Sequence, residues 1–516
     1  MHIKDWANTS PDTPAIIMTG SGEVITFAQL DAASNRGAHL LRSLGLNRGD
    51  GFALWSTNNA RFHEITWTMQ RSGLYMTPIA SKLKPDEAAY IVNDSGSKVV
   101  IVDAEVKHAE EFVSQIKALC PGVEHVYALQ GPLGGLERWE QATAKMPATE
   151  IADQSAGMPM IYSSGTTGTP KGIRKDLPEK PFAEHNPPFY QALSPVEPAT
   201  GYMTTAPMYH VGTLMMTLAE QQMGATIVLM EKFDPEELLK AVDRYKPRRS
   251  QFVPTMFIRL LKLPEEVRAK YDVSSLDLAI HSAAPCPVKV KLAMIEWFGP
   301  ILFDIYGGTE GAGATVITSP EYLKKPGSVG RAVDGIIRIC DDNGDELPIG
   351  VTGTIYFETA NDFSYYNDPE KTKESRNPKH PGWRTYGDIG HVDEDGYLFL
   401  SDRRAFMIIS GGVNIYPQEA ENALILHSKV EDVAVFGVPD DDLGEVVKAV
   451  VQPRNWADAG PELEVELIAY CKDQLSTLKC PRSIDFEQEL PRDITGKMMK
   501  RELRARYWEA RESAGA

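Results

Sequence analysis

Short apolar runs and amphipathic helices alternate along the middle of the chain, and this alternation restricts the fold more than any other feature of the sequence. GATIVLM (224–230) is an apolar run of strand length, and DPEELLKAVDRY follows it, with Asp234 as N-cap and Pro235 at the first helical position. The pattern continues with SQFVPTM, LDLAIHS (276–282), VKVKLAMIEWF and ILFDIY (301–306). Repeated strand–helix–strand units form parallel sheets covered by helices, so we predict an α/β fold.

Length and charge narrow the class of protein. A chain of 516 residues is too long for one core, so we expect two or more domains. The net charge of −18 argues against nonspecific binding to nucleic acid or to an anionic membrane, because both need a basic surface. The five cysteines contain no CxxC pair, and neither a signal peptide nor an apolar run of 18 residues is apparent. We therefore expect a cytoplasmic protein without a membrane span.

Three loops of small residues follow predicted strands: SSGTTGTPKG (163–172), SAAP (282–285) and GGTEGAG (307–313). Ligands of open parallel sheets bind beyond the carboxyl ends of the strands. Hydroxyls and backbone amides bind phosphate oxygens, Lys171 adds positive charge, and Glu310 can share a magnesium ion with phosphates. The ring of Tyr306 beside small residues offers a place for a flat base. The loops predict a site for a nucleoside triphosphate, although SSGTTGTPKG alone would also suit a flexible linker.

Two common nucleotide motifs do not match these loops. A P-loop needs G-x-x-x-x-G-K-[ST], whereas Lys171 follows Pro170 and precedes Gly172. No G-x-G-x-x-G opens a helix after a predicted strand, so the dinucleotide fingerprint is not found either.

Seven segments together resemble one known group of enzymes. They are YSSGTTGTPKG (162–172), PMYH (207–210), DIYGGTE (304–310), WRTYGD (383–388), SDRR (401–404), ISGGVNIYPQEAE (409–421) and PRDITGK (491–497). In order and approximate spacing they resemble the adenylate-forming (ANL) superfamily, in its branch of acyl-CoA synthetases and AMP-dependent ligases. The resemblance implies a two-step reaction with ATP, Mg²⁺ and coenzyme A, in which a carboxylic acid becomes acyl-AMP and is then transferred to a thiol.

The resemblance also implies roles for individual residues. In the first half-reaction, Lys497 bridges the acyl carboxylate and the α-phosphate, Thr309 contacts the α-phosphate and Glu310 binds Mg²⁺. His210 lies beside the acyl carboxylate; the alternative is that His210 has only a structural role. The phosphates of ATP are held by Ser163, Ser164, Gly165, Thr166, Thr167, Gly168, Thr169 and Lys171, adenine by Ala283, Ala284, Asp304, Tyr306 and Gly307, and the ribose by Asp388 and Arg403. The coenzyme A path contains Gly411, Gly412 and Lys479.

A domain boundary is expected near Asp402. Residues 1–401 would form a large AMP-binding and acyl-binding domain with parallel sheets, to which the family adds a small β-barrel subdomain. Residues 402–516 would form a small mobile α+β domain that rotates between the two half-reactions. Two departures from the family pattern affect this picture. Ala405 stands where the family commonly has Asp or Lys at the hinge, and the segment 174–200 lacks the usual helix start.

These observations predict an ATP-dependent acyl-CoA ligase for a hydrophobic fatty, aryl or alicyclic acid. Tyr209, Val211, Phe252 and Met256 are the expected apolar walls of its acid pocket. Three alternatives stay open: an adenylating amide-bond synthetase that uses an amine, a peptide-synthetase adenylation module, and a nucleotide-binding protein without enzymatic activity. A homodimer is also left open.

Overall fold

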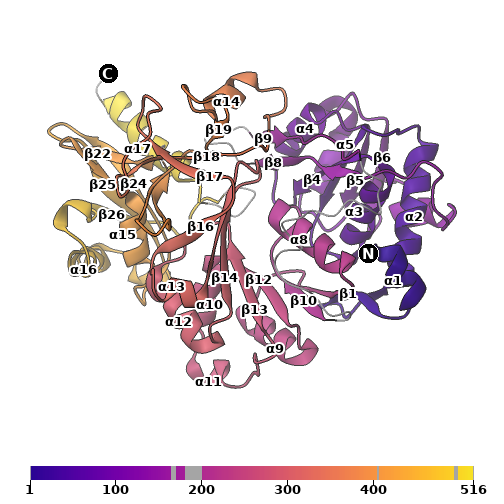
Figure 1. The fold of residues 1–516 in the computed structure, drawn as a ribbon, viewed down its shortest axis with the longest axis horizontal. Coiled ribbons are helices and arrows are strands. Elements are labelled where there is room, and N and C mark those ends of the chain that lie inside the picture. Colours follow the sequence, from indigo (N-terminus) through magenta and orange to yellow (C-terminus); the bar gives the residue numbers. More distant parts are fainter. Residues whose placement is uncertain (1, 164–169, 180–199, 404–405, 493–497, 515–516) are drawn as a thin grey trace. The chain divides into compact units, whose positions relative to one another are not determined.

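Residues 2–163, 170–179, 200–403, 406–492 and 498–514 are described by a computed structural model (Figure 1). The chain divides into two units. Unit 1 comprises Met1–Ser163, Pro170–Pro326 and Asp362–Lys373. Unit 2 contains Gly327–Asn361 and Glu374–Ala516.

The main sheet of unit 1 confirms the predicted α/β alternation. Its strand order is β15–β14–β13–β12–β10–β11–β1–β2. The inner pairs are parallel, whereas β15 runs antiparallel to β14 and β2 runs antiparallel to β1. The strands are β1 (Pro14–Met18), β2 (Val24–Thr26), β10 (Gly201–Thr204), β11 (Thr226–Leu229), β12 (Arg249–Phe252), β13 (Leu278–Ser282), β14 (Leu302–Gly307) and β15 (Ala314–Thr318). The helices between them are α8 (Val211–Gln222), α9 (Pro235–Tyr245), α10 (Pro254–Leu261), α11 (Glu265–Arg268) and α12 (Val288–Phe298), and α13 (Ser319–Tyr322) follows β15.

Helix α9 illustrates why these helices begin where they do. Asp234 Oδ1 accepts hydrogen bonds from the backbone amides of Glu236 and Glu237 at 2.9 and 3.0 Å, which confirms Asp234 as the N-cap. The buried residues of α9 include Leu238, Leu239 and Val242, which recur at helical spacing and form the face that packs against the core.

A second, all-parallel sheet of unit 1 has the order β6–β5–β3–β4–β7. Helix α3 contacts β1 of the first sheet and β4 and β7 of the second, so it lies between the two sheets. Every residue of α3 except Arg61 is buried, as a helix covered on both sides requires. The strands are β3 (Gly51–Ser56), β4 (Tyr75–Ala80), β5 (Val99–Asp103), β6 (His125–Leu129) and β7 (Met158–Pro159); the helices are α1 (Ile3–Thr9), α2 (Phe27–Ser43), α3 (Ala60–Ser72), α4 (Pro85–Asp94), α5 (Ala109–Leu119) and α6 (Trp139–Ala144).

The apolar run MPMIY before the first small-residue loop does not form one strand. It divides into β7, which joins the second sheet, and β8 (Ile161–Ser163), which pairs antiparallel with β9 (Lys171–Ile173). The part of unit 1 at 362–373 lies along this β8–β9 hairpin, and α14 (Pro369–Glu374) starts within it. The loop predicted to hold phosphate therefore connects two hairpin strands.

Unit 2 contains an antiparallel sheet of order β17–β18–β20–β21–β16, with β19 paired to β18. Its strands are β16 (Ser328–Asp334), β17 (Ile336–Cys340), β18 (Gly353–Glu358), β19 (Trp383–Arg384), β20 (Asp388–Val392) and β21 (Leu398–Arg403).

The C-terminal part of unit 2 has a sheet and a core of its own. The sheet order is β23–β22–β25–β24, with β26 parallel to β25. Leu424, Val435 and Leu467 are fully buried in this core, which is the small α+β domain that the sequence predicts. Its strands are β22 (Ile408–Ser410), β23 (Val413–Ile415), β24 (Val430–Asp440), β25 (Gly444–Pro453) and β26 (Ser483–Phe486); its helices are α15 (Pro417–Leu424), α16 (Pro461–Lys472) and α17 (Lys500–Ala514), with 3₁₀ turns η3 (Trp456–Asp458) and η4 (Thr477–Lys479).

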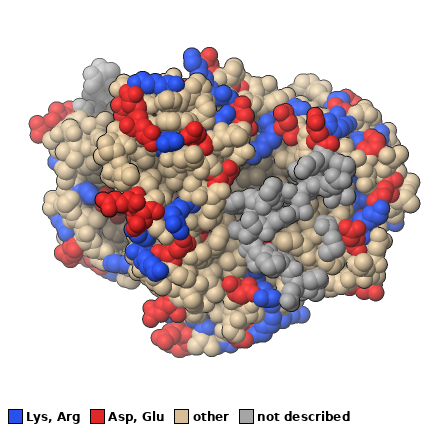
Figure 2. All heavy atoms as spheres, viewed as in Figure 1, with Lys and Arg blue, Asp and Glu red and all other residues tan. Residues whose placement is uncertain are grey.

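The described surface carries both signs of charge. On the face shown in Figure 2, basic and acidic side chains are interspersed rather than gathered into one basic area. None of the described helices has both the length and the apolar character that crossing a membrane requires.

Candidate active site

Lys171 stands at the start of β9, directly opposite Ser163 at the end of β8. Residues Ser164, Gly165, Thr166, Thr167, Gly168 and Thr169, which complete the predicted phosphate loop, lie outside the described residues, as does the side chain of Ser163. The Lys171 side chain is 11% exposed, and its Nζ lies 3.2 Å from Asp368 Oδ2. The hairpin therefore positions a nearly buried lysine, and an acidic residue about 200 positions later in the sequence binds it.

Glu310 follows the carboxyl end of β14, as predicted for the GGTEGAG loop. The hydroxyl of Tyr365 donates a hydrogen bond to Glu310 Oε1 at 2.9 Å. The same Tyr365 ring has its centroid 5.7 Å from Lys171 Nζ. One short part of the chain thus contacts both the lysine and the carboxylate that the sequence assigns to phosphate and metal binding.

The surroundings of Glu310 fit a magnesium ion that is shared with a nucleotide. Mg²⁺ is usually held by one or two carboxylates together with phosphate oxygens and water, rather than by a complete set of protein ligands. The hydrogen bond from Tyr365 uses Oε1, so Oε2 can coordinate an ion. Within the described ranges, no three or more His, Cys, Asp or Glu side chains form a metal site.

The two loops predicted to surround adenine lie at the same edge of the main sheet. β13 and β14 are parallel neighbours, with His281 opposite Asp304, so the loops after them are adjacent. Ala283 has a backbone φ of +74°, which is rarely adopted by residues other than glycine, and Ala284 is exposed. Tyr306, at the end of β14, is partly exposed, and Gly307 is exposed.

The carboxylate of Asp304 forms a buried ion pair beneath this edge. Lys291 Nζ, from α12, donates to Asp304 Oδ2 at 2.6 Å, and the Lys291 side chain is only 1% exposed. The Lys291 ammonium also lies 3.9 Å from the ring centroid of Tyr322. Burial lowers the pKa of the neighbouring His281 to about 4, so this imidazole is neutral near pH 7. Sequence reasoning assigned Asp304 to adenine and missed Lys291, which looks like an ordinary helix residue.

His210 is the N-cap residue of α8, and its ring centroid lies 4.7 Å from that of Tyr209. Among the expected walls of the acid pocket, Tyr209 and Met256 are buried and Val211 is partly exposed. Phe252 is fully buried and packs on Phe257 and Phe298, so the fold gives it a structural role.

The remaining predicted residues belong to unit 2. Asp388 and Arg403 are register partners on β20 and β21, which brings the two proposed ribose-binding positions together; the Arg403 side chain lies outside the described residues. Gly411 and Gly412 have φ of +54° and +81° and connect β22 to β23.

Lys479 is already paired within unit 2. Its Nζ lies 2.8 and 2.6 Å from the two carboxylate oxygens of Glu419. Lys497 and the hinge position Ala405 lie outside the described residues.

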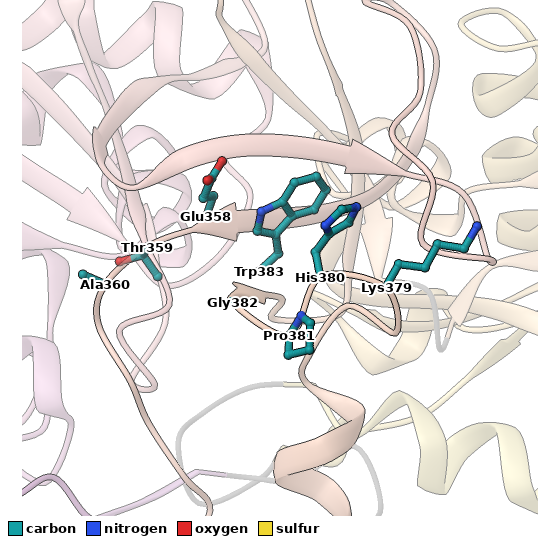
Figure 3. A pocket seen from close by; sticks show the side chains of 8 residues that line it. All are labelled: Glu358, Thr359, Ala360, Lys379, His380, Pro381, Gly382 and Trp383. Carbon is teal, nitrogen blue, oxygen red and sulfur yellow. The ribbon is translucent and has the colours of Figure 1, made fainter.

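A shallow pocket of about 520 Å³ opens elsewhere on unit 2 (Figure 3). The rings of His380 and Trp383 stack there with centroids 4.0 Å apart. Its lining consists of Glu358, Thr359, Ala360, Lys379, His380, Pro381, Gly382 and Trp383. Since this set contains no residue that the sequence assigned to nucleotide, acid or coenzyme A, we keep the pocket separate from the candidate site.

Comparison with known proteins adds two family matches. The family described as AMP-binding enzyme matches residues 3–366, and the AMP-binding enzyme C-terminal domain matches residues 419–497. The boundary predicted near Asp402 lies between these ranges and stays a prediction.

Individual proteins are similar over almost the whole chain. Long-chain-fatty-acid–CoA ligase FadD13 of Mycobacterium tuberculosis is 30% identical over 519 residues, which cover 98% of this chain and 97% of the relative. Feruloyl-CoA synthase of an Amycolatopsis species is 32% identical over 505 residues, with 97% of each protein covered. The structure of o-succinylbenzoate CoA synthetase from Bacillus subtilis, in complex with the acyl-adenylate intermediate OSB-AMP, is 26% identical with a TM-score of 0.79, again covering 97% of each chain.

Proposed function

Because this chain belongs to the AMP-binding enzyme family, we propose that it is an ATP-dependent acyl-CoA ligase that activates a hydrophobic carboxylic acid. Relatives that are named as CoA ligases over nearly the full length support this activity. The structural observation that carries the proposal is the grouping of Lys171 and Glu310 through Tyr365 and Asp368. A cation and a metal-binding carboxylate in one group suit a triphosphate substrate.

The proposed first step joins two anions. A carboxylate oxygen of the acid attacks the α-phosphorus of ATP, the bond to the bridging oxygen of the β-phosphate breaks, and pyrophosphate leaves. Preorganised positive charge and hydrogen-bond donors stabilise the charge that develops in such a transfer. We assign Ser163 to Lys171 to the β- and γ-phosphates, Thr309 to the α-phosphate, and Lys497 to both reacting groups. A magnesium ion held by Glu310 would offset the negative charge of the phosphates.

We assign adenine to Ala283, Ala284, Asp304, Tyr306 and Gly307, and His210 to the acyl carboxylate. Asp388, with two acceptor oxygens, suits the two ribose hydroxyls, assisted by Arg403.

The proposed second step transfers the acyl group to coenzyme A. The thiol sulfur attacks the acyl carbon, the bond to AMP breaks and the thiol proton is released. We assign the Gly411–Gly412 turn to the pantetheine path and Lys479 to a coenzyme A phosphate. Lys479 would have to exchange Glu419 for that phosphate. Rotation of a domain that starts near Asp402 would bring these residues to the acyl-adenylate.

A carboxylate panel tests the activity. Medium and long fatty acids, aryl acids and alicyclic acids are each incubated with ATP, Mg²⁺ and either coenzyme A or a set of amines, and mass spectrometry identifies the products. We expect pyrophosphate, acyl-AMP and an acyl-CoA thioester with an apolar, bulky acid.

Each alternative has its own result in this panel. Amides without thioesters would identify an amide-bond synthetase, and the lack of pyrophosphate with every acid would exclude adenylation. Acetate or a free amino acid as the best substrate by kcat/KM would contradict the proposed hydrophobic pocket. A cytoplasmic location stays a prediction.

A further inference from the structure

Residues 362–373, which we call the 362–373 segment, pair with the β8–β9 hairpin through an isolated bridge. Tyr365 makes an antiparallel bridge with Ile173, and the amide of Tyr366 donates to the carbonyl of Gly172 at 2.8 Å. This backbone pairing begins next to Lys171, so it determines where the side chains of the segment lie relative to the hairpin.

A side-chain network anchors the same segment to α4. Asn367 has a φ of +56°, a left-handed conformation that asparagine tolerates better than most residues. Its Nδ2 donates to Asp94 Oδ1 at 3.1 Å, while the hydroxyl of Tyr162, on β8, donates to Asp94 Oδ2 at 2.6 Å. The turn at Asn367 is therefore tied to the strand that leads into the predicted phosphate loop.

The two carboxylate oxygens of Asp368, the next residue, make different contacts. Oδ1 accepts from the backbone amide of Lys371 at 2.9 Å and caps α14, whereas Oδ2 pairs with Lys171. These two contacts hold the pKa of Asp368 below its usual value. An ammonium group has three N–H donors, so Asp368 can orient Lys171 while the other donors bind phosphate oxygens.

Tyr365 contacts the Glu310 carboxylate, as Asp368 contacts the Lys171 ammonium. Its hydroxyl binds one carboxylate oxygen, and its ring is held against Phe363, with centroids 5.6 Å apart. A donor of this kind fixes the rotamer of a metal-binding carboxylate and leaves its second oxygen toward the ion.

We infer that Tyr365 and Asp368 are positioning residues of the nucleotide site: Tyr365 orients the Glu310 carboxylate for the metal ion, and Asp368 orients the Lys171 ammonium for the phosphates. The inference rests on the proposed function only in so far as Glu310 and Lys171 bind a metal–nucleotide complex. The 362–373 segment thereby couples two binding groups that come from different parts of unit 1.

Tyr365→Phe tests the first half. It removes the hydroxyl and keeps the ring and the strand pairing. Calorimetry with the non-cleavable α,β-methylene analogue of ATP measures binding with Mg²⁺ and, separately, with EDTA. Loss of a group that orients a metal ligand typically weakens metal affinity by about 10- to 100-fold. We expect Tyr365→Phe to weaken binding of the Mg²⁺ complex by a factor in that range and to leave the metal-free affinity unchanged.

Tyr366→Phe is the matched control. The Tyr366 hydroxyl accepts from Arg174 at 3.4 Å, and its ring also lies beside the Arg174 guanidinium. The two variants remove the same atom from adjacent tyrosines. If both change the Mg²⁺-dependent affinity equally, or if neither changes it, the role of Tyr365 is overturned. Thermal unfolding of both variants separates misfolding from a site effect.

Asp368→Asn tests the second half, because asparagine keeps the helix cap and removes the charge. Partly exposed ion pairs have modest energies, so we expect the dissociation constant of the metal-free analogue to rise about two- to fivefold. Asp234→Asn, at the N-cap of α9, is the control for the same substitution. Tighter nucleotide binding by Asp368→Asn would overturn the inference, since Asp368 would then compete for Lys171. An unchanged affinity would overturn it as well.

These tests are separable from the test of the proposed function. Calorimetry needs neither the acid nor the acceptor. If no acid releases pyrophosphate but Tyr365→Phe still loses Mg²⁺-dependent affinity, the activity is wrong and the inference stands. If wild-type protein forms thioester and Tyr365→Phe binds the metal complex like Tyr366→Phe, the activity stands and the inference fails.

Discussion

At the scale of single residues, the most consequential pair is Lys291 with Asp304. Both side chains are nearly buried, and the Nζ–Oδ2 distance is 2.6 Å. Removing one partner of a buried ion pair leaves an uncompensated charge and typically costs about 3–5 kcal/mol, whereas replacing both by apolar residues can be neutral.

We therefore predict that Lys291→Met lowers the free energy of unfolding by about 3–5 kcal/mol in urea denaturation. The double variant Lys291→Met/Asp304→Leu should recover most of this loss. If Asp304 also binds adenine, the double variant will be stable and yet have a raised KM for ATP. That combination would separate the structural role of Asp304 from its proposed nucleotide role.

Lys240→Met is a suitable control, because Lys240 and Glu237 form an ion pair that is exposed on α9. Exposed pairs contribute little, so this variant should unfold at nearly the wild-type urea concentration. If the Lys240 and Lys291 variants lost similar free energies of unfolding, burial of the ion pair would not determine how much its loss destabilises the protein.

At the scale of elements, the hairpin of β22 and β23 depends on its two glycines. Gly411 and Gly412 both have positive φ, which is the signature of a two-residue type I′ turn. A Cβ at Gly412 would meet no atom within 4 Å, whereas one at Gly411 would lie 3.2 Å from Leu443 Cδ2. Strain at Gly412 would therefore come from the backbone, and strain at Gly411 would include a contact.

We predict that Gly412→Ala destabilises the protein by about 1 kcal/mol and that Gly412→Asn costs less, since asparagine tolerates left-handed backbone. Gly411→Ala should cost at least as much as Gly412→Ala. Differential scanning calorimetry gives this order directly. If Gly412→Asn were the most damaging of the three, side-chain volume rather than φ would limit this turn.

The alternation of strand and helix could be predicted because each element has a local pattern. The runs at 224–230 and 276–282 contain the strands β11 and β13, and the run at 301–306 contains all of β14 except Gly307. The division of MPMIY between β7 and β8 could not be predicted, because it depends on which strands are available as partners.

Lys291, Tyr365 and Asp368 were missed for a related reason. Their partners are distant in sequence or on another element, and only the Asp-Pro pair at 368–369 gave a local signal, that of a helix start.

At the scale of the whole molecule, the proposed reaction needs groups from both units. Lys171, Glu310 and the adenine loops belong to unit 1, whereas Asp388, Gly411, Gly412 and Lys479 belong to unit 2. The two half-reactions have different requirements, because adenylation joins two anions while thioester formation needs a path for the thiol. We therefore expect variants that damage one half-reaction and spare the other.

Lys497 and Gly412 should show this separation. If Lys497 stabilises charge only while the carboxylate meets the α-phosphate, Lys497→Ala should slow pyrophosphate release by about 10²- to 10³-fold. Synthetic acyl-AMP plus coenzyme A should then restore near-normal thioester formation. Gly412→Leu should do the opposite, forming acyl-AMP while blocking the pantetheine path.

Because Gly412 has positive φ, Gly412→Leu also strains the turn. Gly412→Asn is the control, since asparagine tolerates this backbone conformation and has a smaller side chain than leucine. Rapid-quench measurement of acyl-AMP and acyl-CoA gives both rates for each variant. If Lys497→Ala slowed both steps equally, the lysine would act through folding or nucleotide binding. A Gly412→Leu variant that forms thioester at the wild-type rate would remove the turn from the pantetheine path. Either result would leave the proposed alternation between two domain positions without support from these residues.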